Sequence, residues 1–176
     1  MRLSNHWLFT WTTYGTWLPG DARGFVSGIR DPDGKRHIHN LTGEPCLSNM
    51  PALQRYAKSR MKGDRVLLNS SQARTLLAQF QETAKHRSLV LHAVAIMANH
   101  IHLVCSATDE HNASTLLKYF KSYGSRCLNT HHGERRWWTV SGSVRRLPDT
   151  RGLENAIEYV MRQHKPLLVW RNEESD

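Results

Sequence analysis

The sequence has little cysteine: three residues in 176, scattered along the chain at Cys46, Cys105 and Cys127. A disulfide framework needs cysteines in pairs, and a structural zinc site needs them clustered at short spacing. An odd and dispersed set fits neither pattern. We therefore expect reduced thiols in a cytoplasmic protein.

Long apolar runs are also absent. No stretch approaches the roughly 20 apolar residues that span a bilayer. The segment Met1–Trp7 contains neither a long apolar run nor a small-residue cleavage site. These absences predict no export signal and no membrane partner. Hydrophobic residues make up 39% of the sequence and charged residues 22%, which is typical of a folded globular chain.

Acidic residues are scarce relative to basic ones. The chain has 15 Asp and Glu against 24 Lys and Arg, which gives a formal net charge of +9. A basic excess of this size on a small protein favours a polyanionic partner, because each neutralised phosphate releases bound counterions. Nucleic acid is therefore the expected partner class.

The length is sufficient for one domain with its own core. We expect a single domain over residues 1–176, with a loop-rich insertion at about residues 20–65, where no apolar periodicity is sustained. One short helix is expected there, from about Pro51 to Lys62. A His-Ile-His stretch at residues 37–39 is expected to lie in a loop. The basic side chains of the short helix suit either a DNA contact or a solvated face: Arg55, Lys58, Arg60 and Lys62.

Two strands are expected where residues 89–104 alternate, with a tight turn at residues 97–99. Residues two apart on a strand point to the same face, so His100 and His102 project together while Ile101 and Leu103 point into a core. Paired imidazoles suit a metal site, although the same spacing also occurs on ordinary exposed strands.

The remaining elements follow from periodicity. Residues 6–14 and 137–147 are rich in aromatic and β-branched residues, which favours strands. Apolar stripes predict helices beginning near residues 69–71, 109–112 and 152, the last extending to His164. The order of elements predicts an α+β fold, a ferredoxin-like antiparallel sheet with helices packed on one face.

The last helix carries a tyrosine outside its core stripe. Tyr159 and Gln163 are four residues apart, so both lie on one face of the helix, away from the apolar stripe. A tyrosine in this position is a candidate for chemistry, and Tyr119 is the rival. Basic residues on other elements are candidate DNA contacts, where tryptophans also occur: Arg135, Arg136, Arg145, Arg146, Lys118 and Lys121.

A family resemblance rests on two short segments. Residues 99–104, Asn-His-Ile-His-Leu-Val, are followed about sixty residues later by Tyr-Val-Met-Arg-Gln at 159–163. Together they resemble the HUH single-tyrosine transposases of bacterial insertion sequences, including the REP-associated tyrosine transposases. The resemblance covers Asn5–Tyr14 and Asn69–His164 but not the insertion. Ala98 stands where the family often has proline, and Pro166 follows the tyrosine later than in many REP-associated members.

The resemblance implies an activity and a site. It implies metal-dependent cleavage of single-stranded DNA and strand transfer through a covalent phosphotyrosine intermediate, with Mg²⁺ or Mn²⁺ as cofactor. The implied nucleophile is Tyr159, and the implied metal ligands are His100, His102 and Gln163. Single-stranded or hairpin DNA is the implied partner, and a homodimer is conceivable. The alternative from another class is a domesticated DNA-binding protein of the same fold that no longer cuts.

Overall fold

The computed structural model describes residues 5–23, 28–30, 36–38, 49–108 and 112–173. The chain divides into two compact units. The first combines Met1–Tyr14 with Val66–Asp176, and the second is Gly15–Arg65. The expected insertion at about residues 20–65 falls within the second unit. Its description as an insertion in a single transposase-like domain stays a prediction.

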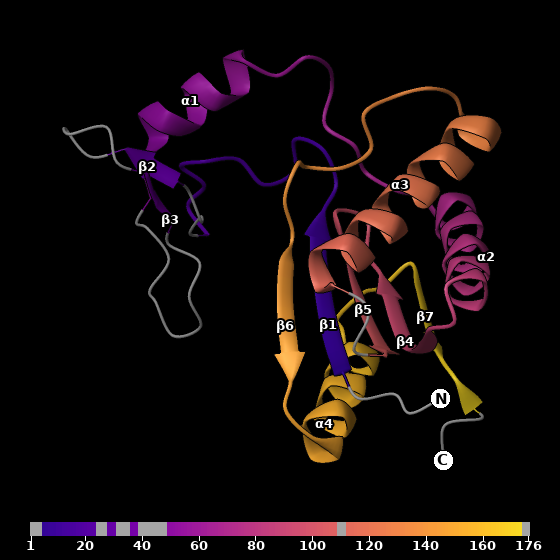
Figure 1. The fold of residues 1–176 in the computed structure, drawn as a ribbon. Helices are drawn as coiled ribbons and strands as arrows, with labels where there is room; N and C mark the ends of the chain where they lie inside the picture. Colours follow the sequence, from indigo (N-terminus) through magenta and orange to yellow (C-terminus); the bar gives the residue numbers. More distant parts are fainter. Residues whose placement is uncertain (1–4, 24–27, 31–35, 39–48, 109–111, 174–176) are drawn as a thin grey trace. The chain divides into compact units, whose positions relative to one another are not determined.

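The first unit is built on a five-stranded antiparallel sheet (Figure 1). The strand order is β6-β1-β5-β4-β7, so β5 is central. Both strands expected in residues 89–104 are present and pair with each other. The edge strand β7 was not expected, because its four residues are too few to show an alternating pattern. The strands are β1 (Asn5–Thr12), β4 (Val90–Ile96), β5 (His100–Ala107), β6 (Ser143–Leu147) and β7 (Leu168–Arg171).

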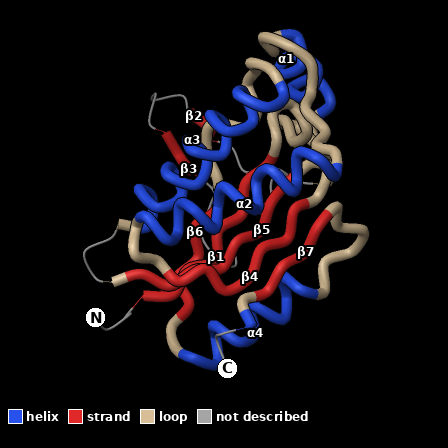
Figure 2. Tube along the Cα trace, turned by 90° about the vertical axis from the view of Figure 1, so that its right-hand side faces the viewer, coloured by secondary structure: helices blue, strands red, loops and turns tan. Residues whose placement is uncertain are grey.

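Helices cover both faces of this sheet. The helices α2 (Ser70–His86) and α3 (Ala113–His132) lie on one face, and α4 (Thr150–Met161) lies on the other (Figure 2). The α+β fold with an antiparallel sheet is confirmed. The expectation that helices pack on one face holds for α2 and α3 and not for α4. The strands β4 and β5 have apolar residues on both of their faces, so each face of the sheet has to be covered.

The predicted helix starts are confirmed by their caps. Asn69 begins α2 with a capping box: its side chain accepts a hydrogen bond from Gln72 N, and the Gln72 side chain accepts one from Asn69 N. Asn112 caps α3, and Asp149 caps α4 by accepting from Gly152 N. Of the helices that the structure describes, none is long and apolar enough to cross a membrane.

The larger core lies between the sheet and the pair α2 and α3. Aromatic rings meet edge to face there: Trp11 contacts Phe80 at 5.7 Å and Trp138 at 6.1 Å between ring centroids. Trp137 and Trp138 are buried, so neither ring is available to stack on a base. Gly124 allows the two helices to approach, because a Cβ atom there would lie 3.1 Å from Leu76 Cδ2.

The second unit contains a short helix and a pair of short strands. The helix α1 (Pro51–Ser59) confirms the helix expected near residues 51–62. The strands β2 (Gly28–Arg30) and β3 (Arg36–Ile38) pair in antiparallel fashion. The loop expected at residues 37–39 is therefore wrong for His37 and Ile38, because pairing with β2 supplies backbone hydrogen bonds that no local pattern announces. His39 lies outside the described residues.

The cysteines that the structure describes are free thiols. Cys105 is buried in β5, where burial raises the pKa of its thiol, and Cys127 lies half-buried on α3. Cys46 lies outside the described residues.

A polar cluster is buried at the end of the sheet opposite the β4–β5 turn. A bulge in β4 between Leu91 and Ala93 leaves His92 unpaired in the ladder. Its Nε2 is hydrogen-bonded at 2.6 Å to the hydroxyl of Ser106, which is also 2.6 Å from His6 Nδ1. His92 is 7% exposed, and its Nδ1 has no hydrogen-bond partner among the described residues. Burial, and to a smaller extent the charge of His6, lowers the pKa of His92 to about 4.

This cluster predicts acid sensitivity. The folded pKa of His92 lies below its ordinary value of 6.5, so the unfolded chain binds more protons between these two pH values. The free energy of unfolding should fall as the pH drops from about 6.5 to about 4, by about 3 kcal/mol for this one group. Denaturant titrations across this range test the prediction. His92→Gln should remove this part of the dependence, and His131→Gln, at an exposed site, should retain it. Equal pH profiles for His92→Gln and the unaltered protein would contradict it.

Candidate active site

Two histidines project from the central strand toward α4. Along β5, Ile101 and Leu103 are fully buried in the core under α2 and α3. His100 and His102 therefore point to the opposite face, where Val104 of the same strand packs with Ala156 of α4. The two imidazole rings lie 5.0 Å apart between centroids. The predicted pairing of the imidazoles on one face is observed.

His102 is held in place by the neighbouring strand. In the β1–β5 ladder it stands opposite Thr10, and the Thr10 hydroxyl and His102 Nδ1 share a hydrogen bond of 2.7 Å. The ring is 5% exposed. Burial, and to a smaller extent the charge of His100, lowers the pKa of His102 to about 4. At neutral pH the imidazole is therefore uncharged, which is the form that binds a metal ion.

Asn99 fixes the tautomer of His100. The Asn99 side-chain oxygen Oδ1 lies 2.7 Å from His100 Nδ1. A carbonyl oxygen only accepts hydrogen bonds, so Nδ1 carries the proton and donates it. The lone pair then lies on Nε2. Histidine ligands of metal ions commonly have this arrangement, in which the second ring nitrogen donates to a carbonyl or carboxylate.

Tyr159 lies beside this pair. Ala156 and Val160 form the buried face of α4, and Tyr159 stands on its flank with 50% of its surface exposed. Its ring lies 5.3 Å from the His102 ring between centroids, in an edge-to-face arrangement. The rival Tyr119 belongs to α3 on the other side of the sheet, where the Arg87 guanidinium lies 4.1 Å from its ring centroid. Only Tyr159 of the two shares a face with the histidines.

Gln163 lies just beyond the helix. We expected α4 to continue to His164, but it ends at Met161, with Arg162 as its C-cap. The Gln163 amide nitrogen Nε2 donates a hydrogen bond of 3.0 Å to the backbone oxygen of Tyr159. This bond satisfies a carbonyl group that the end of the helix leaves without a partner. The side-chain oxygen Oε1, which is the atom of an amide that binds metal ions, takes no part in this hydrogen bond.

The donor atoms fit a divalent metal ion by their chemistry. Two imidazoles and one amide oxygen are ligands that Mn²⁺ and related ions accept. Across the described ranges no group of three His, Cys, Asp and Glu side chains is placed to hold a metal ion. Any site here would therefore need the amide of Gln163 or the substrate to complete it.

A groove leads to Tyr159 along one flank of α4. It has a volume of about 620 Å³ and runs between β6 and α4. Arg145 of β6 and Arg151 of α4 line it, and Asp149, whose side chain caps the helix, is its acidic residue. Hydroxyl and amide groups also line it: Thr10, Ser143 and Asn155. The groove can take a chain of phosphates.

The opposite flank of α4 has a different charge character. The pocket there is lined by Glu154, Glu158, Arg162 and Arg171, together with the buried His92. Glu158 and Arg162 form an ion pair with each other. On this flank the two acidic and the two basic side chains balance, whereas the two arginines of the other groove outnumber Asp149, so its charge favours a phosphate backbone. Of the two flanks, the one that contains Tyr159 is therefore the one suited to DNA.

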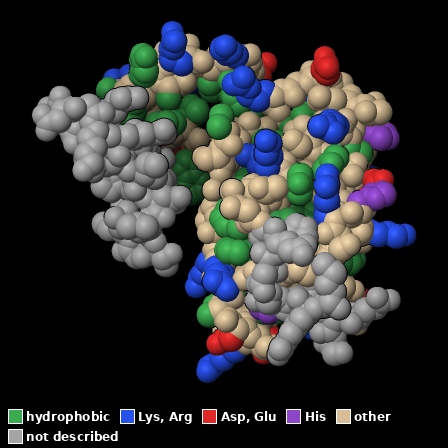
Figure 3. Space-filling model, viewed as in Figure 1, with side chains coloured by type: hydrophobic (Ala, Val, Ile, Leu, Met, Phe, Trp, Pro, Cys, Tyr) green, Lys and Arg blue, Asp and Glu red, His purple; other side chains and the backbone are tan. Residues whose placement is uncertain are grey.

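The six candidate DNA contacts are distributed over different surfaces. Arg145 lies in the groove beside Tyr159, whereas the next residue, Arg146, donates a hydrogen bond of 2.8 Å to Asn5 Oδ1. The Arg135 and Arg136 guanidinium groups lie over the rings of Trp137 and Tyr14. Basic side chains are spread over α3 and β6 on the face drawn in Figure 3. Their roles in DNA binding stay predictions.

Lys121 has a structural role in the first unit. Its ammonium group donates hydrogen bonds to the backbone oxygens of Thr139, Val140 and Ser141, at 2.6, 3.1 and 2.9 Å. Burial lowers the pKa of Lys121 to about 8, so the group is still charged at neutral pH. The three bonds use all its protons and hold the loop before β6. Any phosphate contact would have to replace one of them.

We expect Lys121→Met to destabilise this loop. The change leaves three carbonyl oxygens without their donor, and water can replace it only in part, so a loss of about 1 to 3 kcal/mol is expected. Thermal unfolding and amide hydrogen exchange at residues 139–142 measure the effect. Lys118→Met, on the exposed side of α3, is the control and should change neither. Unchanged exchange in Lys121→Met would show that the ammonium group does not hold the loop.

Three site residues escaped the sequence reasoning. Thr10 reaches His102 only through the pairing of β1 with β5, which lie about ninety residues apart in the chain. Arg151 lines the groove because α4 packs on the sheet beside β6, which is a tertiary contact. For Asn99 the sequence contains a signal, since a side-chain carbonyl directly before a histidine can hold its ring, although the pattern of the two strands indicates only a turn there.

Comparisons with known proteins give the family and the fold. The model for the family described as IS200-like transposases matches residues 58–163. A solved structure of a REP-associated tyrosine transposase bound to a REP hairpin aligns with a TM-score of 0.51 and 11% identity, covering 90% of this chain. This chain spans 66% of that protein. At such low identity the likeness shows a shared fold alone.

A second solved structure, of a candidate transposase from Deinococcus radiodurans R1, aligns at 16% identity with a TM-score of 0.48, covering 93% of this chain and 94% of that one. No curated protein matches the sequence. The family model covers well over half of the chain and includes both histidines, Tyr159 and Gln163. The predicted resemblance to the transposases of bacterial insertion sequences is confirmed, and the chain belongs to the family of IS200-like transposases.

Proposed function

We propose that this protein cuts single-stranded DNA and transfers the strand through a covalent bond to Tyr159. The observation that carries the proposal is the position of Tyr159, which is half exposed, has its ring centroid 5.3 Å from that of His102, and lines a groove with two arginines. An exposed nucleophile, a pair of imidazoles and a groove with arginines are the parts that attack on a phosphodiester requires.

The reaction exchanges one phosphate ester for another. The Tyr159 oxygen attacks the phosphorus atom, a new P–O bond forms to the phenol, and one P–O bond of the DNA backbone breaks. The phenol gives up its proton to solvent, and the leaving oxygen takes one up to become a free hydroxyl. Because the phosphotyrosine is itself an ester, a second DNA hydroxyl can attack it and release Tyr159. This is the chemistry of strand transfer.

His100, His102 and Gln163 would hold a divalent metal ion, Mg²⁺ or Mn²⁺. When bound, such an ion draws charge from a phosphate oxygen and favours the phenolate form of tyrosine. The chain's own contribution is to present ligands without charge. Asn99 holds the Nε2 lone pair of His100 in place, and burial keeps His102 neutral. Gln163 is oriented by its bond to the Tyr159 backbone.

The groove residues would position the strand. Arg145 and Arg151 can bind phosphates on the side of Tyr159 that leads along β6. Arg135, Arg136, Arg146 and Lys118 would extend binding to further parts of the DNA. The aligned REP-associated transposase is bound to a REP hairpin, and a hairpin or single-stranded DNA is proposed as the partner here.

The formation of a covalent adduct between the protein and DNA tests this proposal. Incubation with a labelled single-stranded or hairpin oligonucleotide and Mn²⁺ should give a protein–DNA conjugate that survives denaturing electrophoresis. Tyr159→Phe removes the nucleophilic oxygen and should abolish the conjugate. Tyr119→Phe, on the other face of the sheet, is the matched control and should form it normally. A conjugate that persists in Tyr159→Phe would disprove the assignment of the nucleophile. Tight DNA binding without a conjugate on any substrate tested would instead identify a binding protein that does not cut.

Substitutions at Asn99 should change the affinity for the metal ion according to whether they keep a hydrogen-bond acceptor. Asn99→Ala removes the acceptor of the His100 Nδ1 proton, so the ring loses its fixed tautomer and orientation. We expect Mn²⁺ affinity, measured by titration calorimetry, to fall by about 10- to 100-fold. Asn99→Asp keeps an acceptor oxygen in the same place and should restore binding. If the alanine variant binds Mn²⁺ as tightly as the unaltered protein, His100 is not a ligand.

A further inference from the structure

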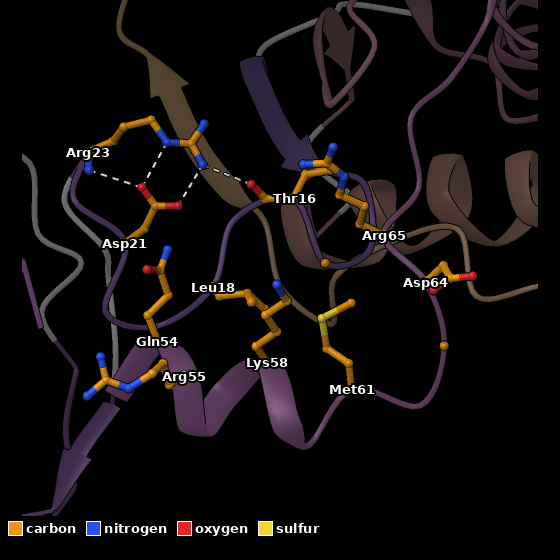
Figure 4. A pocket seen from close by; sticks show the side chains of 12 residues that line it. Thr16, Leu18, Asp21, Arg23, Gln54, Arg55, Lys58, Met61, Asp64 and Arg65 are labelled. Carbon is orange, nitrogen blue, oxygen red and sulfur yellow. Dashed lines mark hydrogen bonds and ion pairs between the residues drawn. The ribbon is translucent and has the colours of Figure 1, made fainter. Parts of the chain in front are cut away.

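The second unit contains a pocket of its own, with a volume of about 970 Å³ (Figure 4). One wall is the segment of residues 15–23, and the other is α1 with the segment that follows it to Arg65. All the lining residues belong to the unit Gly15–Arg65. The volume lies in the range of pockets that bind small organic ligands, about 300 to 1,000 Å³.

Two glycines bring the walls together at the ends of the pocket. Gly15 has φ +72°, and a Cβ atom there would lie 2.3 Å from Met61 Cε and 3.1 Å from Arg65 Cα. Gly20 has φ +91°, and its Cβ would lie 2.4 Å from the backbone oxygen of Met50. Side chains at these positions would separate the walls. The contacts at both ends leave the hollow between them open.

One wall is fixed by an ion pair between the buried Asp21 and the exposed Arg23. The Asp21 carboxylate is 7% exposed and accepts two hydrogen bonds from the Arg23 guanidinium, at 2.8 and 2.7 Å. The hydrogen bond from Arg23 holds the pKa of Asp21 at about 2. The guanidinium also donates to the backbone oxygen of Thr16 and lies over the ring of Trp17. Figure 4 shows these bonds joining the two ends of the same wall. The turn is therefore held in one shape.

The other wall contributes cations that have no acidic partner. Arg55 and Lys58 come from α1, and Arg65 comes from the segment after it. Within the part of the chain that the structure describes, no carboxylate forms an ion pair with any of the three. Cations around a hollow attract an anion when, as among the described residues here, no carboxylate is ion-paired with them. Asp64 is the acidic residue of the lining that is not paired with Arg23.

The lining also has apolar and amide groups. The Leu18 and Met61 side chains lie in the pocket, and Gln54 projects from α1 toward the segment that contains Asp21 (Figure 4). An apolar surface suits the flat face of a nucleobase, and an amide can donate to and accept from its edge. Cations, an apolar patch and an amide in one hollow therefore match the parts of a nucleotide.

We propose that this pocket binds one nucleotide unit of a single-stranded DNA, with the phosphate at Lys58 and Arg65 and the base against Leu18 and Met61. The choice of DNA as the source of the nucleotide rests on the proposed function, whereas the pocket and its charges do not. The family model begins at residue 58, so the wall formed by residues 15–23 lies outside the part of the chain that it describes. The pocket is a binding site separate from the one that contains Tyr159.

Binding of a labelled oligonucleotide tests the proposal. The measurements use full-length Tyr159→Phe protein, so they do not depend on cutting. Replacing Lys58 and Arg65 together by alanine should weaken binding by roughly five- to twentyfold, and should reduce the slope of log affinity against log salt by about 0.7, because the contact to one phosphate of a single strand is lost. Arg60→Ala is the matched control, since this exposed cation ends α1 without lining the pocket, and should change affinity by less than about twofold.

The variant Leu18→Trp tests the shape of the pocket independently of its charge. It fills part of the pocket and leaves the net charge unaltered, so it should also weaken binding while the far-ultraviolet circular dichroism stays the same. If Arg60→Ala weakens binding as much as the double variant does, or if neither pocket variant weakens it, the proposal is overturned.

A free mononucleotide identifies the source of the ligand. Millimolar deoxyadenosine monophosphate should compete only weakly with the oligonucleotide for unaltered protein. If the mononucleotide binds tightly and the oligonucleotide does not need Lys58 and Arg65, the pocket takes a free nucleotide and the assignment to a DNA strand is wrong. The adduct test on Tyr159 is independent of every one of these outcomes, so failure of one proposal is distinguishable from failure of the other.

Discussion

The packing of α4 against the histidine face of the sheet is the interaction on which the candidate active site depends. Ala93 and Ala95 of β4 lie in the small core beneath the helix, together with Val160 of α4. Small side chains let the helix lie close to the strands. That closeness brings the centroid of the Tyr159 ring to 5.3 Å from the centroid of the His102 ring. It also buries the His102 imidazole, which therefore stays neutral.

The two faces of the sheet serve different purposes. The face under α2 and α3 holds the aromatic core, including Trp11 and Phe80, and its polar groups are few. The face under α4 alternates small apolar residues with polar ones, and its two flanks differ in charge. A single helix cannot cover a five-stranded sheet, so grooves remain on either side of α4. The groove with Arg145 and Arg151 is the one that a phosphate chain can enter.

The unit Gly15–Arg65 adds a second cationic surface with a different construction. Its hollow depends on glycines at positive φ and on the ion pair between Asp21 and Arg23 rather than on a sheet. An arginine that is fully paired with a carboxylate shapes the wall, while Lys58 and Arg65 leave their charge unmatched among the described residues. The distinction between paired and unpaired cations decides which residues could bind an anion.

The sequence by itself determined the strands β1, β4 and β5, the helices and the placement of His100 and His102 on one face, because alternation, apolar stripes and capping residues are local signals. The short strands β2, β3 and β7 carry no such signal. The resemblance then singled out Tyr159. Only the tertiary structure decided that α4 lies opposite α2 and α3, that Lys121 supports a loop, and that Thr10 and Arg151 belong to the site. These facts follow from which strands pair and which face a helix covers. Both are set by contacts between residues far apart in the chain, which no local pattern encodes.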